Sequence, residues 1–231
     1  MAFLNYLLWL FFPKRCAVCG KIIARKEDLC DTCQQNIERI EKSCAVCGGT
    51  DKNCECRRFV YRFVGCVAPF YKGENSMKMI YNFKLHGRLD SAPFLAENIY
   101  VKIEKYYSDQ KFDIITAVPM SIFKRIGKGY NHSEVIAKAL ARKMGARYKD
   151  LLIKKPFRKS QHTLSRDARF ENVKGMFRPI SKFNYKKVLL IDDVKSTGAT
   201  LNECTKELLF AGCEEVYCAV AVANVLGIEK K

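Results

Sequence analysis

Residues 188–200, which read VLLIDDVKSTGAT, bring together an apolar run, two adjacent carboxylates and a cluster of small polar residues. The apolar run predicts a buried strand, and the cluster after it predicts a turn whose backbone N–H groups face an anion at a helix start. Asp192 and Asp193 would accept hydrogen bonds from hydroxyl groups, and the turn would donate hydrogen bonds to a phosphate. This combination indicates a phosphorylated sugar as the ligand.

Spacing excludes two other glycine-loop motifs. The sequence around Gly198 contains neither the G-x-G-x-x-G of dinucleotide-binding folds nor the G-x-x-x-x-G-K-[ST] of a P-loop. At Gly127, Ile122 stands where the first P-loop glycine would be needed. The less specific alternative is a strand-to-helix turn capped by Thr197 or Thr200, with acids that are only solvated.

The chain from residue 58 onward has the alternating pattern of an α/β domain. Apolar runs predict strands, the first with an optional hairpin around Gly65, over residues 59–71, 112–118, 187–191 and 216–223. Amphipathic periodicity predicts helices over residues 74–86, 90–106, 131–144 and 200–211. This alternation implies right-handed crossovers and a mainly parallel sheet, with ligands beyond the carboxyl ends of the strands.

The helix over residues 131–144 has the clearest end signals. Asn131 and Glu134 form an Asn-x-x-Glu start that predicts a capping box, and Gly145 supplies a stop. Three loops would meet at the carboxyl edge of the sheet: residues 117–121, the basic segment 154–169 and residues 192–200.

Eight of the twelve cysteines lie between residues 16 and 56 in four pairs. The motif C-A-V-C-G occurs at residues 16–20 and 44–48 and has the form of a zinc knuckle. In a reducing compartment this spacing favours two four-thiolate zinc sites over disulfides. The expected ligands are Cys16, Cys19, Cys30, Cys33, Cys44, Cys47, Cys54 and Cys56.

The pairing of these cysteines is open. Successive ribbons, which use the first four and the last four cysteines as separate sets, are preferred over a cross-brace that interleaves them. The other cysteines lie in strand or helix patterns and are expected to be small core residues: Cys66, Cys204, Cys213 and Cys218.

The charge balance indicates an anionic partner. The 231 residues carry 41 Lys and Arg against 24 Asp and Glu, a formal net charge of +17. Such a surface attracts nucleic acid, phosphorylated ligands or anionic membrane. Residues 154–178 interleave basic side chains with Phe157, Phe170 and Phe177, a pattern that suits single-stranded nucleic acid. A solvated loop is the alternative interpretation.

The twelve residues before Pro13 form the most apolar segment. They fall short of the about twenty residues that cross a bilayer, and they lack the basic start and cleavage site of a signal peptide. We expect a short helix packed on the main domain of a cytoplasmic protein, with a membrane-surface anchor as the alternative. The chain thus divides into a short helix (1–13), a double zinc ribbon (14–57) and an α/β domain (58–231).

Residues 188–200 resemble the diphosphosugar-binding signature of type I phosphoribosyltransferases, except at Lys195, where the signature usually has an apolar or aromatic residue. The resemblance implies a type I phosphoribosyltransferase fold whose paired acids accept hydrogen bonds from the ribose hydroxyls of 5-phosphoribosyl 1-diphosphate. It also places the 5′-phosphate in the turn. The expected binding residues are Asp192, Asp193, Val194, Lys195, Ser196, Thr197, Gly198, Ala199 and Thr200.

The same resemblance assigns the pyrophosphate, with Mg²⁺, to the loop after strand 112–118 and to a mobile flap in the basic segment. The residues expected there are Pro119, Met120, Ser121, Lys124, Arg125, Lys128, Arg158 and Arg166. The sequence identifies no acceptor for ribosyl transfer, so it leaves open whether the protein is an enzyme.

Four features in a fixed order narrow the family: the cysteine knuckles, KGYNHSE at 128–134, QHTLSRDARFENVKGMF at 161–177, and the Asp-Asp loop. They closely resemble the ComF family of competence-associated proteins over nearly the whole chain. The resemblance implies binding and handling of single-stranded DNA in natural transformation. A DNA-uptake helicase or membrane channel would be a further partner, at the inner face of the membrane.

Two alternatives to this function remain. One is an active phosphoribosyltransferase in nucleobase salvage, and the other is a purely structural adaptor.

Overall fold

The computed structural model describes residues 13–49, 54, 56, 59–85, 87–156 and 166–224. The predicted apolar helix, apart from Pro13, lies outside the described residues, as does the part of the flap that contains Arg158. None of the described helices combines the length and the apolar character that a bilayer crossing requires.

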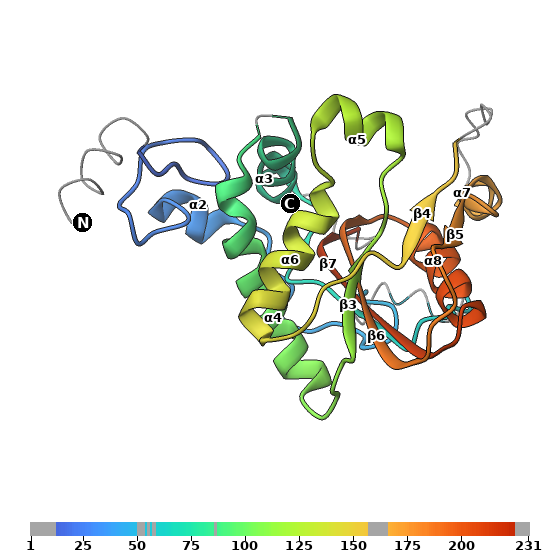
Figure 1. Ribbon diagram of the computed structural model, residues 1–231. Coiled ribbons are helices and arrows are strands. Elements are labelled where there is room, and N and C mark those ends of the chain that lie inside the picture. Colours follow the sequence, from blue (N-terminus) through green and yellow to red (C-terminus); the bar gives the residue numbers. More distant parts are fainter. Residues whose placement is uncertain are drawn as a thin grey trace.

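Helices and strands alternate along the α/β part of the chain (Figure 1). The helices are α2 (Asp31–Asn36), α3 (Glu74–Leu85), α4 (Ala92–Tyr107), α5 (Ile122–Lys128), α6 (His132–Met144), α7 (Arg166–Val173) and α8 (Ala199–Phe210), with a short 3-10 helix at Leu89–Ser91. The strands are β1 (Gly65–Val67), β2 (Phe70–Tyr71), β3 (Ile114–Ala117), β4 (Leu152–Lys154), β5 (Phe177–Pro179), β6 (Tyr185–Lys195) and β7 (Cys213–Ala223).

The main sheet is parallel throughout. Its strands follow the order β1-β7-β6-β3, and β2 also pairs with β7. Leu189 at the centre of β6 aligns with Ile115 of β3 on one side and with Tyr217 of β7 on the other. Strands β4 and β5 form a separate antiparallel pair. The predicted α/β fold with a mainly parallel sheet is confirmed.

The chain leaves the neighbouring strands β3 and β6 toward opposite sides of the sheet. After β3, helices α5 and α6 lead to Tyr148, which forms a parallel bridge with Ile115 on the edge of β3 away from β6. After β6, helix α8 leads to β7 on the other side. Ligands of open parallel sheets bind at such a reversal. The loops that follow β3 and β6 therefore border one candidate site.

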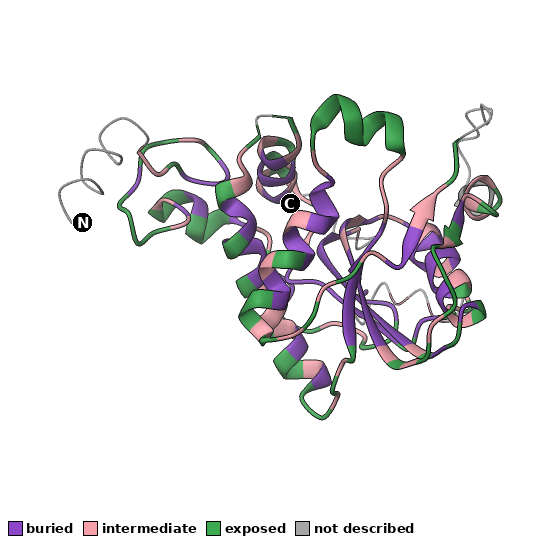
Figure 2. Cartoon of the chain, in the orientation of Figure 1, coloured by how far each residue is buried: buried purple, intermediate pink, exposed green. Residues whose placement is uncertain are grey.

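Two apolar cores cover the two faces of the sheet, whose strands are buried between the helices (Figure 2). Leu189 and Ile191 join the core under α3, α4 and α6, whereas Val188 and Leu190 join the core under α8. All four side chains are fully buried, and each contributes about 1.5–3 kcal/mol. The second core also contains, as predicted, Cys66, Cys204, Cys213 and Cys218.

The cysteine-rich segment docks on the α/β domain through both of its knuckles, among other contacts. Asn82 of α3 donates hydrogen bonds to the carbonyls of Ala17 and Val18, at 3.2 and 2.7 Å. In the second knuckle, the Ala45 carbonyl accepts the Cys66 N–H of β1 at 3.1 Å. Gly48 has a φ of +70°, and a Cβ there would lie 2.8 Å from the Cys66 carbonyl oxygen. Only glycine allows this close approach, so the second knuckle lies directly against the sheet.

Two local predictions are wrong. Residues 59–71 form neither one strand nor a hairpin, because β1 and β2 each pair in parallel with β7. Gly65 serves a close approach instead of a turn, since a Cβ there would lie 2.6 Å from a backbone oxygen of the second knuckle. Asn131 does not cap α6 with its side chain, because its amide donates to the Val118 carbonyl at 2.9 Å. Gly145 does end α6, in the left-handed conformation.

Candidate functional site

The loop between β6 and α8 borders a pocket at the carboxyl edge of the sheet. Strand β6 continues to Lys195 and α8 starts at Ala199, so the two acids lie inside the strand and the turn itself is short. The pocket has a volume of about 230 Å³ and is lined by Asn172, Val173, Asp192, Val194, Lys195, Ser196, Thr197, Gly198, Ala199, Thr200 and Leu201. Of the predicted sugar-phosphate residues, only Asp193 is not part of this lining.

The turn is built so that backbone N–H groups at the start of α8 border the pocket. Gly198 precedes the helix with a φ of +81°, in the left-handed region where glycine is favoured. Thr197 Oγ1 accepts the Ala199 N–H at 3.3 Å. A helix start of this kind carries partial positive charge and suits a phosphate.

Asp192 is a half-buried acid at the pocket wall, and two donors hold it. Its Oδ1 accepts the Ser133 hydroxyl at 2.7 Å and the Asp193 N–H at 2.9 Å. Burial, followed by the neighbouring charge of Asp193, raises the pKa of Asp192 to about 7, against the lowering effect of Ser133, the Asp193 N–H and Lys84. Asp192 can therefore change its protonation state near neutral pH.

Asp193 is paired with a lysine that sequence reasoning missed. Lys84, in the last turn of α3, places Nζ 2.7 Å from Asp193 Oδ1, and the two side chains are 32% and 13% exposed. The Lys84 carbonyl lies 3.2 Å from Nε2 of His132, whose pKa is lowered by burial. Lys84 and Asp193 are 109 positions apart, so no sequence motif could have revealed this pair. A hydroxyl that binds Asp193 must share this carboxylate with Lys84 or displace it.

The predicted pyrophosphate loop lies beside the sugar-phosphate loop. It starts where the Val118 N–H donates to the Ile191 carbonyl at 2.9 Å, and it continues through Pro119, Met120 and Ser121. The side chain of Asn131 holds its start through the Val118 carbonyl. The structure thus brings the two predicted loops to adjacent strand ends.

The cations after this loop lie on α5 and have different surroundings. Arg125 pairs with Glu134 at 3.0 Å and approaches Asp150 at 3.9 Å, so its charge is directed to carboxylates of the protein. Lys128 Nζ donates to the Lys84 carbonyl at 3.4 Å. Lys124 is exposed, and its charge contributes to a lowered pKa at Lys154, after the larger effect of burial. Two cations therefore lie close together at this edge of the molecule.

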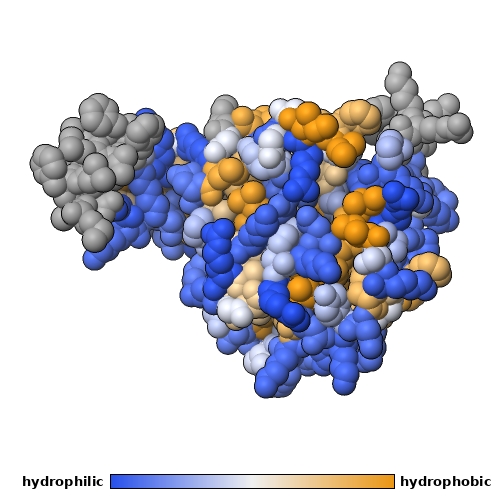
Figure 3. Space-filling model, viewed as in Figure 1, coloured by the Kyte–Doolittle hydropathy of each residue, from blue (hydrophilic) through white to orange (hydrophobic). Residues whose placement is uncertain are grey.

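Helix α5 stands out from the rest of the fold and buries none of its own residues (Figure 1). Its apolar side chains are unusually exposed, at 58% for Ile122, 73% for Phe123 and 76% for Ile126. Figure 3 shows apolar surface gathered over this helix. Exposed apolar patches beside basic residues mark interaction surfaces.

The predicted flap is described only in part. Arg158 and the side chain of Arg166 lie outside the described residues. Strand β4 ends at the start of this segment, α7 begins inside it and β5 follows it, and the sequence patterns predicted none of the three. Asn172 and Val173 at the end of α7 line the pocket. The end of α7, which follows the flap, thus borders the sugar-phosphate loop on one side.

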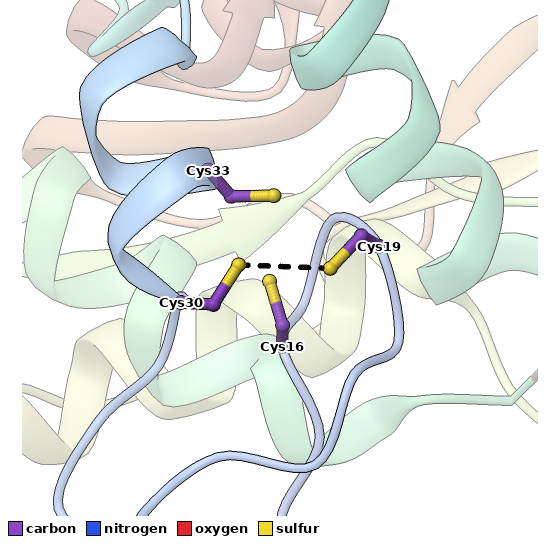
Figure 4. A group of neighbouring side chains, drawn as sticks. All are labelled: Cys16, Cys19, Cys30 and Cys33. Carbon is purple, nitrogen blue, oxygen red and sulfur yellow. Dashed lines mark hydrogen bonds between the residues drawn. The ribbon is translucent and has the colours of Figure 1, made fainter.

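The paired cysteines gather in two successive clusters, Cys16–Cys19–Cys30–Cys33 and Cys44–Cys47–Cys54–Cys56, with the sulfurs of each cluster within 4.8 Å of one another. In the first cluster the four sulfurs point toward a common centre (Figure 4), and those of Cys19 and Cys30 lie 3.7 Å apart. In the second, the distances are 3.7 Å from Cys44 to Cys56 and 3.8 Å from Cys47 to Cys54. The preferred arrangement of successive ribbons matches this grouping.

Both clusters fit a tetrahedral zinc ion. A Zn–S bond of about 2.3 Å in tetrahedral geometry requires sulfurs about 3.8 Å apart, which is the spacing present. Burial opposes ionisation of Cys16, yet hydrogen bonds from backbone N–H groups prevail and lower its pKa to about 7. The pKa of Cys44 is lowered to about 7 by the same balance, whereas burial and then the neighbouring thiols raise the pKa of Cys33 and Cys56. The chain therefore contains sites for structural zinc in its N-terminal segment.

Comparison with known protein families shows which class of protein this chain belongs to. The phosphoribosyl transferase domain family matches residues 131–231, and the double zinc ribbon domain family matches residues 7–58. Together with the parallel sheet and the cysteine clusters, these matches define a protein of type I phosphoribosyltransferase fold with an N-terminal double zinc ribbon. The predicted fold class is confirmed.

Three relatives align with this chain over most of its length and narrow the class further. Competence protein F of Haemophilus influenzae is 28% identical over 219 residues, which cover 89% of this chain and 95% of that protein. Competence protein ComFC of Streptococcus pneumoniae is 29% identical over 225 residues, covering 87% and 96%. DNA utilization protein YhgH of Escherichia coli K12 is 24% identical over 209 residues, covering 88% of each. The chain is a homologue of the ComF competence proteins, and the predicted resemblance is confirmed.

Proposed function

We propose that this protein binds phosphoribosyl diphosphate in the pocket between β6 and α8 and single-stranded DNA on the adjacent basic surface. In this role it handles incoming DNA during natural transformation, on the cytoplasmic side of the membrane. The observation that carries the proposal is the pocket at the switch in strand order, which combines the half-buried Asp192 with the amino end of α8. The names of the competence relatives support the cellular role.

The two ends of the pocket would bind different parts of a sugar phosphate. The carboxylates of Asp192 and Asp193 would accept hydrogen bonds from the ribose hydroxyls, and the N–H groups at the start of α8 would bind the 5′-phosphate. The diphosphate would extend toward the loop at Pro119 and Met120. Mg²⁺ bound with the ligand would neutralise diphosphate charge there.

Helix α5 supplies the chemistry that single-stranded DNA needs. Phe123 offers an exposed ring for base stacking, and Lys124 and Lys128 offer charge for phosphates, to which the half-buried Lys154 at the end of β4 adds. Burial, followed by the charge of Lys124, lowers the pKa of Lys154. With a net charge of +17 on the whole chain, association with a polyanion is favoured.

The DNA part is tested by the anisotropy of a labelled single-stranded oligonucleotide. The double variant Phe123→Ala/Lys124→Ala should weaken binding about tenfold or more, because it removes one stacking platform and one cation. Its salt dependence, on a plot of log affinity against log salt, should become shallower by about 0.7.

A matched control removes the same residue types elsewhere. Phe210 is 71% exposed at the end of α8 away from the loop, and Lys182 Nζ lies 5.0 Å from its ring centroid. Lys182→Ala/Phe210→Ala should leave the affinity unchanged. Equal losses in both variants would mean that general charge binds DNA, and an unchanged affinity in the α5 variant would exclude this surface.

Ribosyl transfer to a nucleobase is the alternative activity of the same pocket. It predicts magnesium-dependent release of pyrophosphate from phosphoribosyl diphosphate when a purine or pyrimidine is added. Binding of the sugar diphosphate without such release supports a ligand-binding role.

A further inference from the structure

Tyr61 lies against the sugar-phosphate loop, although it belongs to the segment that follows the second cysteine cluster. Its hydroxyl donates to the Thr197 carbonyl at 3.1 Å. A Cβ on Gly198 would lie 2.9 Å from the Tyr61 ring, so the ring touches the loop at its left-handed glycine. Tyr61 thus contacts the two residues that give the turn its shape.

Tyr61 also accommodates the one unusual residue of the loop. Lys195 is only 3% exposed, and its Nζ lies 5.5 Å from the centroid of the Tyr61 ring. A buried ammonium gains more from an aromatic face than a solvated one does. The lysine that replaces an apolar or aromatic residue of the signature is therefore matched by a tyrosine from a distant part of the chain.

Residues 59–63, which we call the aromatic strap, contact both helices beside the pocket. Phe59 stacks on Phe170 of α7 with ring centroids 5.1 Å apart. The backbone N–H of Arg62 donates to Asn202 Oδ1 of α8 at 2.7 Å. Within the strap, Tyr61 stacks on Phe63 at 4.7 Å. The strap therefore connects the elements that line the pocket.

The start of the strap is tied to the second cysteine cluster. Cys56, a member of that cluster, precedes Phe59 by three positions, a span of at most about 11 Å. On its other side the cluster is held on β1 through the Ala45 carbonyl and the close approach of Gly48 to Cys66. Movement at the cluster would thus be transmitted both to β1 and, along the chain, to the strap.

We propose that Tyr61 is a positioning residue, which holds the sugar-phosphate loop in its binding conformation and couples the loop to the second cysteine cluster. The part that concerns affinity rests on the proposed binding of phosphoribosyl diphosphate. Coupling between two sites is reciprocal. The sugar diphosphate should therefore slow loss of zinc from the second cluster, and zinc in that cluster should strengthen its binding.

The test compares Tyr61→Ala and Tyr61→Phe with Tyr81→Ala, a control at an exposed tyrosine of α3. Two quantities are measured in the full-length zinc-loaded protein: amide hydrogen exchange of residues 196–200 without ligand, and affinity for phosphoribosyl diphosphate by calorimetry. Tyr61→Ala should speed exchange and weaken binding about tenfold, the combined effect of one hydrogen bond and one cation–π contact. Tyr61→Phe keeps the ring but loses the hydroxyl, so its exchange rate and affinity should lie between those of the wild type and Tyr61→Ala. Tyr81→Ala should match the wild type in both quantities.

The outcomes separate this inference from the proposed function. If the wild type binds no sugar diphosphate, the proposed function fails, and faster exchange in Tyr61→Ala still supports the positioning role. If Tyr61→Ala folds and shows unchanged hydrogen exchange at residues 196–200 and unchanged affinity, the positioning role is overturned, even if the melting temperature falls. Should Tyr61→Ala not fold, Tyr61→Phe and Lys195→Met decide by the same two readouts.

Discussion

Asp192 should make the stability of this protein depend on pH in the sense opposite to that of a salt-bridged aspartate. Burial and the charge of Asp193 raise its pKa from an ordinary 3.8 to about 7 in the folded protein. Between these two values the folded state binds a proton that the unfolded state has released, so the contribution to stability falls as pH rises. It is complete below about pH 4 and is lost as the pH passes through about 7.

The size of the effect follows from the same two values. At about 1.4 kcal/mol per pH unit, the difference between 3.8 and about 7 corresponds to about 4 kcal/mol. Asp192→Asn replaces the acid by a neutral side chain that can still accept the Ser133 hydroxyl. The variant should match the wild type in free energy of unfolding near pH 4 and exceed it by up to about 4 kcal/mol at pH 8.

Urea denaturation at half-unit steps from pH 4 to 8 measures this difference directly. Asp109→Asn, at an exposed acid after α4, removes the same charge and serves as the control. Only Asp192→Asn should show a stability gain that grows with pH. A constant gain, or the same pH dependence in the control, would refute the assignment of a proton-binding acid with a raised pKa to this position. A confirmed gain would mean that the protein retains a destabilising carboxylate for its ligand.

Three further predictions concern the surroundings of the pocket. Lys84→Met should cost about 1–3 kcal/mol in urea denaturation at pH 8, because it leaves Asp193 without the cation at 2.7 Å, and Lys84→Arg should recover most of that loss. Cys19→Ser and Cys47→Ser should each remove one of two bound zinc ions in elemental analysis, since each breaks a separate cluster; loss of both ions in either variant would contradict independent sites. Ile136→Ala, at a fully buried side chain of α6, should cost about 2–5 kcal/mol without changing affinity for the sugar diphosphate, as thermal melts and calorimetry would show.

The main elements of the fold could be predicted from local pattern. Helices α3, α4, α6 and α8 carry amphipathic periodicity, and Gly145 and Gly212 mark two of their ends. Strands β3, β6 and β7 are continuous apolar runs because both faces of the sheet are covered. In these cases the physical cause lies within about fifteen neighbouring residues, which is why the sequence alone reveals it.

The errors have causes that lie far apart in the chain. Gly65 suggested a turn, but the small residue is needed because the second knuckle approaches β1 closely. Asn131 suggested a cap, but its amide is used by the loop after β3. Strands β4 and β5 are three residues each and pair across the flap, so neither is long enough for a period to appear.

In the candidate site, too, the features set by neighbouring residues could be predicted and those set by distant residues could not. The sugar-phosphate loop is contiguous in sequence, and its pocket could be anticipated from residues 192–200 alone. Lys84 and Tyr61 reach the loop from the N-terminal half, and no spacing rule connects them to it. Arg125, which the resemblance places at the pyrophosphate, forms ion pairs with Glu134 and Asp150, two carboxylates that no spacing rule connects to it.

Calorimetric titration of phosphoribosyl diphosphate, with Mg²⁺, into the zinc-loaded protein tests the central claim most directly. We predict saturable binding at one site per chain, which Asp192→Asn/Asp193→Asn abolishes while its circular dichroism spectrum stays that of the wild type. Absence of binding to the wild type, or equal affinity in the double variant, would contradict a sugar-phosphate pocket between β6 and α8.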